Sequence, residues 1–232
     1  MSYAKLILMR HGESIYNQKN LFTGWSDVEL SERGVQEAKN AGTILKREAL
    51  YPDICYTSWL KRAIHTAQFA LREMEWEHID VVRSYRLNER HYGAWQGRDK
   101  DRIKNEVGEE QFLAVRRGFD VAPPPLREDD ERVAWREKKY AGFDHTLLPL
   151  SESLKETQNR VVPYYKEIIK KELRASKTLL ISAHGNSLRA LVAFLEQMKQ
   201  EDIPALEIPT GEIILYSFDK ELNIVKKEVF LG

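Results

Sequence analysis

Two short apolar runs far apart in the chain both lead into a histidine followed by a glycine. The runs 6–9 and 178–182 end close to His11-Gly12 and His184-Gly185. Unbroken apolar runs of this length that end near a glycine are typical of strands buried in a parallel sheet. Ligands of such sheets bind at the carboxyl ends of the strands. If the two strands are neighbours, both imidazoles face one crevice.

Between these runs, helix-like and strand-like patterns alternate. Apolar residues at three-to-four spacing predict a helix from Ser31 to Glu48, with Ser31 as its cap. A strand is expected at 54–57, and Ser58 is expected to cap a helix over 59–74. Another apolar run follows at 79–82.

The C-terminal third continues the alternation. Ser153 and Glu156 fit a capping box at the start of a helix that runs to about Arg174, and Pro163 inside it is expected to bend it. The remaining expected elements are a strand at 177–182, a helix at 188–198 and closing strands at 213–218 and 224–230.

The segment at about 99–150 departs from this alternation. It is more charged, contains a short helix-like stretch at 111–117, and includes the triple proline 123–125, which cannot continue a helix. We therefore predict a single α/β domain over 1–232, a three-layer sandwich with a mostly parallel sheet and helices on both faces. The segment at about 99–150 is expected to form a lobe inserted beside the sheet.

Composition indicates a soluble globular protein. The 232 residues are 42% apolar and 31% charged, and the 36 basic residues equal the 36 acidic ones. No overall field favours nucleic acid or a membrane, so an anion site has to be local. The first apolar run is too short for a signal peptide, and no stretch approaches 18 apolar residues, so a cytoplasmic protein is expected. The single cysteine, Cys55, excludes an intramolecular disulfide and is expected to be buried and inert.

The residues around the two histidines favour phosphoryl chemistry over metal binding. Histidine serves as metal ligand, base or nucleophile, but the sequence has no cysteine cluster and no His-x-x-x-His pair. Arginine instead pairs bidentately with phosphate oxygens and keeps its charge. Arg10 ends an apolar strand, where an arginine needs a buried anion to meet it. The other candidate cations are Arg62, Lys100, Arg116 and Arg117.

Glycines and one carboxylate complete the candidate chemistry. Gly12 and Gly185 let the main chain approach a ligand closely, and Thr23-Gly24 adds a hydroxyl in an apolar loop. Each of these is equally compatible with an ordinary turn. Glu89 is the only acid in the run 87–97, and a carboxyl raised in pKa could give a proton to a leaving alkoxide.

Several strings in the chain resemble the cofactor-dependent phosphoglycerate mutases of the histidine phosphatase superfamily. Arg-His-Gly marks only the superfamily, whereas Phe-Thr-Gly-Trp at 22–25 and Leu-Asn-Glu-Arg-His-Tyr-Gly at 87–93 are more specific to the mutases. The resemblance covers nearly the whole chain. Further matching strings are 8–17, 26–31, Arg62-Ala63-Ile64 with Thr66, Arg116-Arg117, 152–155, 184–189 and 208–211.

This resemblance implies a mutase that interconverts 2- and 3-phosphoglycerate in glycolysis and gluconeogenesis. His11 would accept a phosphoryl group from the primer 2,3-bisphosphoglycerate without a metal, beside His184, and Glu89 would exchange the substrate hydroxyl proton. The implied ligands of the transferring phosphate are Arg10, Arg62, Asn17, Gly185 and Asn186. The implied ligands of the rest of the substrate are Thr23, Gly24, Arg90, Tyr92, Lys100, Arg116 and Arg117. Members of the family commonly form homodimers or homotetramers.

Two departures from the family pattern leave alternatives open. Longer members carry a tail after the Leu-Gly at 231–232, and its absence predicts more hydrolysis of the phosphohistidine, hence more phosphatase activity. Val115, Gly118 and Phe119 also flank the arginine doublet where the family usually has Trp with Ser or Ala, which affects the expected fine substrate contacts. A phosphatase of the same superfamily is therefore one alternative. A silent phospholigand-binding protein is the other, and the presence of His11, Glu89 and His184 argues against it.

Overall fold

A twisted sheet lies at the centre of the computed structural model, which describes residues 3–231. Within that range its strands are β1 (Ala4–Arg10), β2 (Ile54–Thr57), β3 (Asp80–Arg83), β4 (Thr178–Ala183), β5 (Ile213–Phe218) and β6 (Ile224–Phe230). Their order across the sheet is β3-β2-β4-β1-β5-β6. The first four in this order run parallel, whereas β5 and β6 are antiparallel to their neighbours. The predicted mostly parallel sheet is confirmed.

The two histidine-bearing strands are hydrogen-bonded neighbours in the middle of the sheet. Their register pairs Lys5 with Thr178 at one end and Arg10 with Ala183 at the other. His11 and His184 follow these last paired residues directly. The predicted adjacency is therefore correct, and both imidazoles leave the sheet at the same edge.

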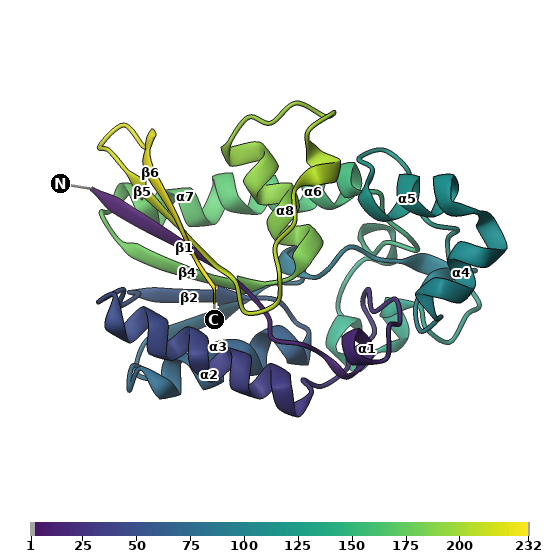
Figure 1. Cartoon of the computed structure of the whole chain (residues 1–232), viewed down its shortest axis with the longest axis horizontal. Helices are drawn as coiled ribbons and strands as arrows, with labels where there is room; N and C mark the ends of the chain where they lie inside the picture. Colours follow the sequence, from purple (N-terminus) through teal and green to yellow (C-terminus); the bar gives the residue numbers. More distant parts are fainter. Residues whose placement is uncertain (1–2, 232) are drawn as a thin grey trace.

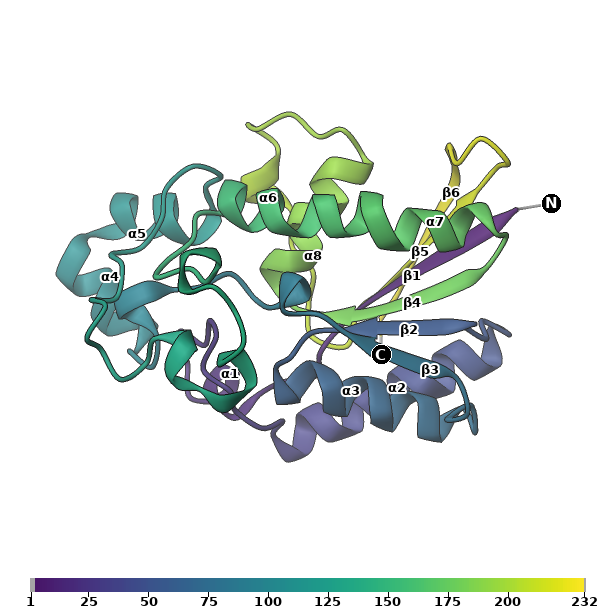
Figure 2. The ribbon, with the colours of Figure 1, turned by 180° about the vertical axis from the view of Figure 1, so that it is seen from behind.

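Helices cover both faces of the sheet (Figures 1 and 2). Helices α2 (Glu32–Arg47) and α3 (Lys61–Glu73) lie on one face, and α6 (Leu154–Tyr164), α7 (Lys170–Arg174) and α8 (Gly185–Leu195) lie on the other. Alternate residues of β1 belong to the hydrophobic clusters on the two faces of the sheet, because successive side chains of a strand point to opposite faces. Ile7 and Met9 pack with α2 and α3, whereas Leu6 and Leu8 pack with α6 and α8. Burial on both faces explains why the run 6–9 is apolar throughout.

The predicted capping box opens α6. The Ser153 hydroxyl accepts from the backbone N–H of Glu156, whose carboxylate accepts from the N–H of Ser153. The helix continues past Pro163, and a π turn at Tyr165–Ile169 joins α6 to α7. The predicted helix is therefore continuous, and its winding changes locally to a π turn just after Pro163.

The remaining segments lie beyond the carboxyl ends of the parallel strands (Figure 1). They comprise α1 (Ile15–Gln18), α4 (Lys100–Val107), α5 (Glu109–Arg117) and a stretch at 118–153 with single 3₁₀ turns at 134–136, 138–140 and 145–147. Tyr140 and Phe143 from that stretch pack on Trp25 and Trp59. This contact holds the stretch against the loop after α1.

Two predicted helix starts are wrong. The helix expected at 188 begins at Gly185, because the N–H of His184 donates to Ser187 Oγ and this bond closes the first turn three residues earlier. The helix expected after Ser58 begins at Lys61, and Leu60 precedes it with no side-chain cap. The Ser58 hydroxyl accepts from the N–H of Leu60, before the helix begins, and also contacts Nε2 of His184.

Two further features of the described residues concern membrane helices and the single cysteine. Among residues 3–231, no helix has the length and apolar content that crossing a membrane requires. Cys55 is buried in β2, as expected, and burial raises the pKa of its thiol to about 12. A thiol with that pKa is not a nucleophile near neutral pH.

Candidate active site

A cavity of about 270 Å³ lies at the carboxyl ends of β1 and β4. Segments from the whole length of the chain meet there, from α1 to the loop before β5. All but two of the predicted site residues line it. They are Arg10, His11, Asn17, Thr23, Gly24, Arg62, Glu89, Tyr92, Lys100, Arg116, Arg117, Gly185 and Asn186.

His11 presents an unprotonated ring nitrogen to this cavity. Its Nδ1 lies 2.6 Å from the carbonyl oxygen of Gly12, a contact that assigns the proton to Nδ1. Its Nε2 then carries a lone pair, which accepts from Nε of Arg62 at 3.3 Å. Burial, and next the positive charges of Arg62 and Arg10, lower the pKa of His11 well below its ordinary value. The ring is therefore neutral near pH 7, the form in which imidazole attacks an electrophile.

Arg62 is fully buried in the first turn of α3. It donates to the carbonyl oxygens of Gly24 at 2.8 Å and Ser26 at 3.0 Å, besides its contact with His11. Burial lowers its pKa to about 10, so the guanidinium keeps its charge at neutral pH. These acceptors are all neutral. A buried cation without a carboxylate in direct contact indicates a site prepared for an anion.

Arg10 is the last residue of β1 and precedes His11 directly. Its Nη1 donates to the carbonyl oxygen of Ile208 at 2.5 Å. The guanidinium packs on the backbone of Gly185, where an added Cβ would lie only 3.3 Å from Cζ. Its Nε is buried and has no hydrogen-bond partner among the described residues. Burial lowers the pKa of Arg10, which again favours a ligand that brings negative charge.

His184 lies immediately behind His11. The two ring centroids are 5.0 Å apart and the ring planes differ by 62°. Nε2 of His184 is 2.8 Å from Ser58 Oγ, whereas its buried Nδ1 contacts no polar atom of the described chain. Burial, followed by the charge of Arg62, lowers its pKa well below the ordinary value. This imidazole does not reach the cavity wall, but it contacts the ring that does.

Glu89 supplies a carboxylate at the edge of the cavity. Its side chain is held by two backbone donors, because Oε1 accepts from the N–H of Arg90 at 2.7 Å and of Asn186 at 3.0 Å. Asn186 belongs to the first turn of α8, so helix and carboxylate are in direct contact. The second oxygen of Glu89 is available to a ligand.

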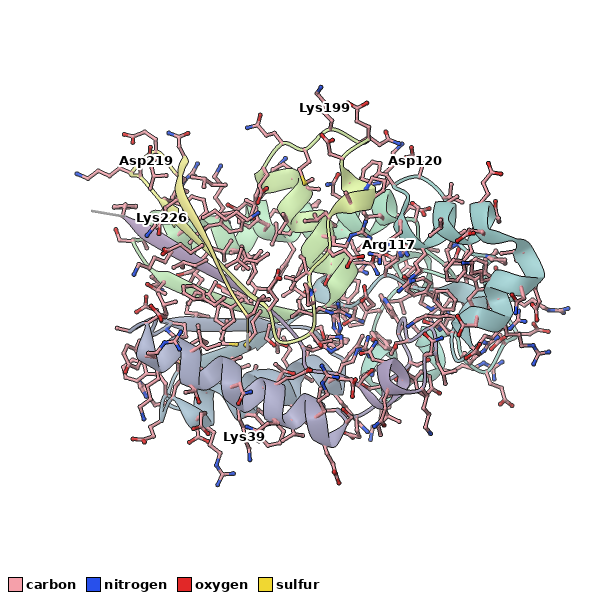
Figure 3. The ribbon with its side chains drawn as sticks, in the orientation of Figure 1. Lys39, Arg117, Asp120, Lys199, Asp219 and Lys226 are labelled. Carbon is pink, nitrogen blue, oxygen red and sulfur yellow. The ribbon has the colours of Figure 1, made fainter. Side chains whose placement is uncertain are left out.

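A second group of cations lies at the end of the cavity farther from the sheet. Lys100 begins α4, and Arg116 and Arg117 end α5. Burial and the neighbouring charge of Arg116 lower the pKa of Lys100. Arg117 pairs with Glu207. In Figure 3, Arg117 lies towards the middle of the molecule, whereas Lys39 and Lys199 extend from its edges.

Arg90 does not line the cavity, contrary to its predicted role in binding substrate. It is fully buried behind Tyr92, with Nη2 donating to the Tyr92 hydroxyl at 2.7 Å and Nη1 to the carbonyl of Val115 at 2.8 Å. Burial raises the pKa of Tyr92. The charge of Arg90 and the hydrogen bonds from Arg90 and Asn186 outweigh this effect, so the pKa is lowered. Arg90 thus fixes and polarises a hydroxyl that does face the cavity.

The cavity carries a large excess of positive charge. Six cations (Arg10, Arg62, Lys100, Arg116, Arg117, Arg189) and two carboxylates (Glu89, Glu207) line it, which gives a formal charge of +4. Across residues 3–231 there is no group of three or more His, Cys, Asp or Glu side chains arranged to hold a metal ion. The arrangement suits a ligand with several negative charges.

Comparison with known proteins agrees with this geometry. The model of the histidine phosphatase superfamily (branch 1) matches residues 6–141 and 126–228. The chain belongs to this superfamily. A relative from Treponema denticola is 49% identical over 228 residues, which are 98% of this chain and 92% of the relative. A relative from Lachnoclostridium phytofermentans is 52% identical over 98% of this chain and 91% of its own. Both are named 2,3-bisphosphoglycerate-dependent phosphoglycerate mutase.

Two solved structures share the fold. A mycobacterial glucosyl-3-phosphoglycerate phosphatase in complex with VO3 superimposes with a TM-score of 0.74 at 24% identity, over 99% of this chain and 98% of that one. The Bacillus stearothermophilus protein YhfR gives 0.71 at 23% identity, over 99% and 96%. At this identity the likeness concerns the fold alone.

Sequence reasoning missed part of the cavity wall of this superfamily member. Arg189 lines it and donates to Asn186 Oδ1 at 2.9 Å, and burial lowers its pKa to about 10. Arg189 lies one turn after Asn186 in an otherwise apolar helix, and this position was the signal in the sequence that could have indicated a cavity-lining cation. Glu207 also lines the cavity, although nothing in the sequence distinguishes it from a surface glutamate. The other unpredicted lining residues are Leu21, Phe22, Ile208 and Pro209.

Proposed function

We propose that this chain is a 2,3-bisphosphoglycerate-dependent phosphoglycerate mutase, which interconverts 2- and 3-phosphoglycerate through a phosphohistidine at His11. One observation carries the proposal: the neutral His11, unprotonated at Nε2, lines a cavity whose lining has a formal charge of +4. The names of the two relatives that are about half identical over nearly the whole chain support the choice of substrate.

In the first half-reaction, Nε2 of His11 attacks the phosphorus of a bound phosphoester. The N–P bond forms as the P–O bond to the sugar-acid oxygen breaks, and Glu89 in its protonated form gives that oxygen a proton. Arg10 and Arg62 neutralise charge on the transferring group, and His184 packs against the ring of His11 that carries it. 2,3-Bisphosphoglycerate, when bound, supplies the phosphoryl group that primes His11.

The second half-reaction is the reverse with the other hydroxyl. Ionised Glu89 accepts the proton of the substrate hydroxyl. The oxygen of that hydroxyl attacks the phosphorus as the N–P bond breaks. Both steps need charge neutralisation, and the arginines and the first turn of α8 provide it in this proposal without a metal.

The distribution of cations matches a ligand with two phosphates and one carboxylate. Each phosphate carries about −1.5 to −2 at pH 7, so such a ligand brings roughly −4 to −5 against the +4 of the cavity lining. We assign the transferring phosphate to Arg10, Arg62 and the amide of Gly185, with Asn186, whose own N–H donates to Glu89, beside it. The second phosphate and the carboxylate are assigned to Lys100, Arg116 and Arg117, with Thr23, Gly24 and Tyr92. Asn17 lines the same cavity and is assigned to the transferring phosphate.

Phosphorus-31 NMR of the purified protein tests this directly. With 3-phosphoglycerate, a catalytic amount of 2,3-bisphosphoglycerate and excess EDTA, we expect the resonance of 2-phosphoglycerate to grow to its equilibrium share. His11→Gln is expected to abolish this, whereas His78→Gln, on an exposed side chain, leaves it unchanged. Inorganic phosphate formed faster than 2-phosphoglycerate would replace the mutase with a phosphatase, and dependence on a metal would refute the metal-free mechanism.

A further inference from the structure

One buried ion pair outside the cavity holds the segment that carries Glu89. Arg160 lies on α6, and Glu152 lies just before that helix, with side chains only 13% and 4% exposed. Arg160 Nε donates to Glu152 Oε1 at 2.6 Å and Nη2 to Oε2 at 2.8 Å. Neither residue lines the cavity. A two-point Arg–carboxylate pair of this kind is rigid and well oriented.

The other hydrogen bonds that Arg160 donates all go to one stretch of backbone. Nη1 donates to the carbonyl oxygens of Arg86 at 2.9 Å and Asn88 at 3.0 Å, and Nη2 donates to that of Glu89 at 2.8 Å. The guanidinium thus binds three carbonyls within four residues. Such a stretch has no partner strand, so without Arg160 the carbonyls of Arg86 and Asn88 would lack donors.

Glu152 holds the end of the same stretch. Its Oε2 accepts from the backbone N–H of His91 at 2.8 Å, and its own N–H donates to the carbonyl oxygen of His91 at 2.9 Å. Together the pair fixes the backbone on both sides of Glu89. Both partners have their charges satisfied within this arrangement, which offsets the cost of burying them.

The anchored backbone sets the position of the Glu89 carboxylate. The carbonyl of Glu89 accepts a second bond, from Trp25 Nε1 at 2.5 Å, while its carboxylate is held at the far end by the N–H of Asn186. The Glu89 residue is therefore held at its backbone carbonyl and at its carboxylate. A displacement of about 1 Å at a reacting group costs on the order of 100-fold in rate.

We propose that Arg160 and Glu152 are positioning residues for proton transfer by Glu89. The Arg160–Glu152 pair determines where the carboxylate lies relative to the oxygen that leaves or attacks, and it does not contact the substrate. The proposal rests on the function assigned to Glu89 above, but it makes a claim about backbone anchoring that holds for any phosphoester.

The leaving group separates positioning of Glu89 from a general loss of structure. An alkoxide needs a proton as it leaves, whereas p-nitrophenolate does not. For Arg160→Lys and Glu152→Gln we expect kcat for mutase turnover to fall about 100-fold with KM within about threefold. First-turnover release of p-nitrophenolate from p-nitrophenyl phosphate, measured by stopped flow, is expected to stay within about threefold of the unaltered protein. Equal losses on both substrates would overturn the proposal.

Arg86→Lys is the matched control. Arg86 lies in the same segment, but its side chain is 38% exposed and contacts Glu167 at the surface. We expect this variant to behave as the unaltered protein on both substrates. In addition, hydrogen exchange followed by mass spectrometry is expected to show faster exchange of peptides covering 86–92 in Arg160→Lys and not in Arg86→Lys. Unchanged exchange in Arg160→Lys would also refute the anchoring.

The design keeps this proposal apart from the proposed function. If the unaltered protein forms no 2-phosphoglycerate, the mutase assignment fails, and the same comparison is made with hydrolysis of glycerol 2-phosphate against p-nitrophenyl phosphate. If Arg160→Lys does not fold, Glu152→Gln decides, because its amide oxygen still accepts from His91 while the charge on Arg160 loses its partner.

Discussion

Nε of Arg62 donates to Nε2 of His11 across 3.3 Å, and this contact joins the first turn of α3 to the end of β1. Burial and next the charge of this guanidinium lower the pKa of the imidazole, which keeps Nε2 unprotonated. The same guanidinium lies where a phosphoryl group bound to Nε2 would carry negative charge. One buried cation therefore serves both the free and the phosphorylated state of His11.

Arg62→Lys tests this double role. A lysine has one donor centre and cannot reach His11, Gly24 and Ser26 together, so we expect kcat to fall by about 100- to 1000-fold. The measurement is mutase turnover by NMR, together with trapping of the phosphoenzyme by rapid quench. Arg72→Lys is the control, because Arg72 is an exposed residue in the last turn of the same helix. Activity within a few-fold in Arg62→Lys would show that a point charge suffices.

The buried histidines predict how stability depends on pH. Burial lowers the pKa of His91 to about 3, whereas its ordinary value in an unfolded chain is about 6.5. Below pH 6.5 the unfolded chain therefore binds a proton that the folded chain does not. The free energy of unfolding falls as the pH decreases from 6.5 towards 3, by up to about 1.4 kcal/mol per pH unit for this residue.

His91→Asn isolates that contribution. The asparagine oxygen can replace Nδ1 as acceptor for the N–H of Gly93, and it does not titrate. Urea unfolding at pH 6.5 and pH 5 is expected to show a loss of stability smaller by about 2 kcal/mol than in the unaltered protein. The exposed His78→Asn should leave the loss unchanged. An equal loss in His91→Asn would mean that His91 is already protonated in the folded state.

The sheet and the catalytic edge were predictable because their signals are local. An unbroken apolar run such as 6–9 is required wherever both faces of a strand are covered, so the pattern identifies β1 and β4 without knowledge of their partners. The capping box at Ser153 is equally local. Adjacency of the two histidines then followed from the general rule about parallel strands.

Other parts of the site depend on contacts that no local pattern carries. Serine commonly caps helices, but the hydroxyl of Ser58 contacts His184, which lies 126 residues away in the chain. The family resemblance implied that Arg90 binds the substrate, yet its donors are used by Tyr92 and Val115. Arg160 follows the capping box as an ordinary helical arginine, and only the folded chain shows that it binds the backbone next to Glu89.

Gly34 provides a prediction about stability. It is the third residue of α2, where alanine usually stabilises a helix by about 1 kcal/mol relative to glycine. An added Cβ would lie 1.9 Å from the backbone oxygen of Glu13, and one on Gly12 would lie 2.1 Å from that of Gly34. We expect Gly34→Ala to lower the free energy of unfolding by about 2 kcal/mol or more, because two backbones have to separate.

Urea denaturation of Gly34→Ala checks this expectation. Gly142→Ala is the control, since an added Cβ there would meet nothing within 4 Å, and its stability is expected to stay within about 0.5 kcal/mol. Because Gly34 packs against the residues next to His11, mutase activity is expected to fall as well. A stabilised Gly34→Ala would show that the helix shifts at little cost.

Lys100 tests the binding of the substrate at the end of the cavity away from His11. Burial and the charge of Arg116 already disfavour its ammonium, so a ligand with negative charge is expected to relieve an unfavourable arrangement. We expect Lys100→Gln to raise KM at least about tenfold, equivalent to about 1.4 kcal/mol of binding, with kcat changed by less than about threefold. Lys104→Gln, one turn further along α4 and paired with Glu109 at the surface, is the control and should keep the original KM. A fall in kcat with KM unchanged would instead place Lys100 at the transferring phosphate, and the assignment of the two ends of the cavity would have to be exchanged.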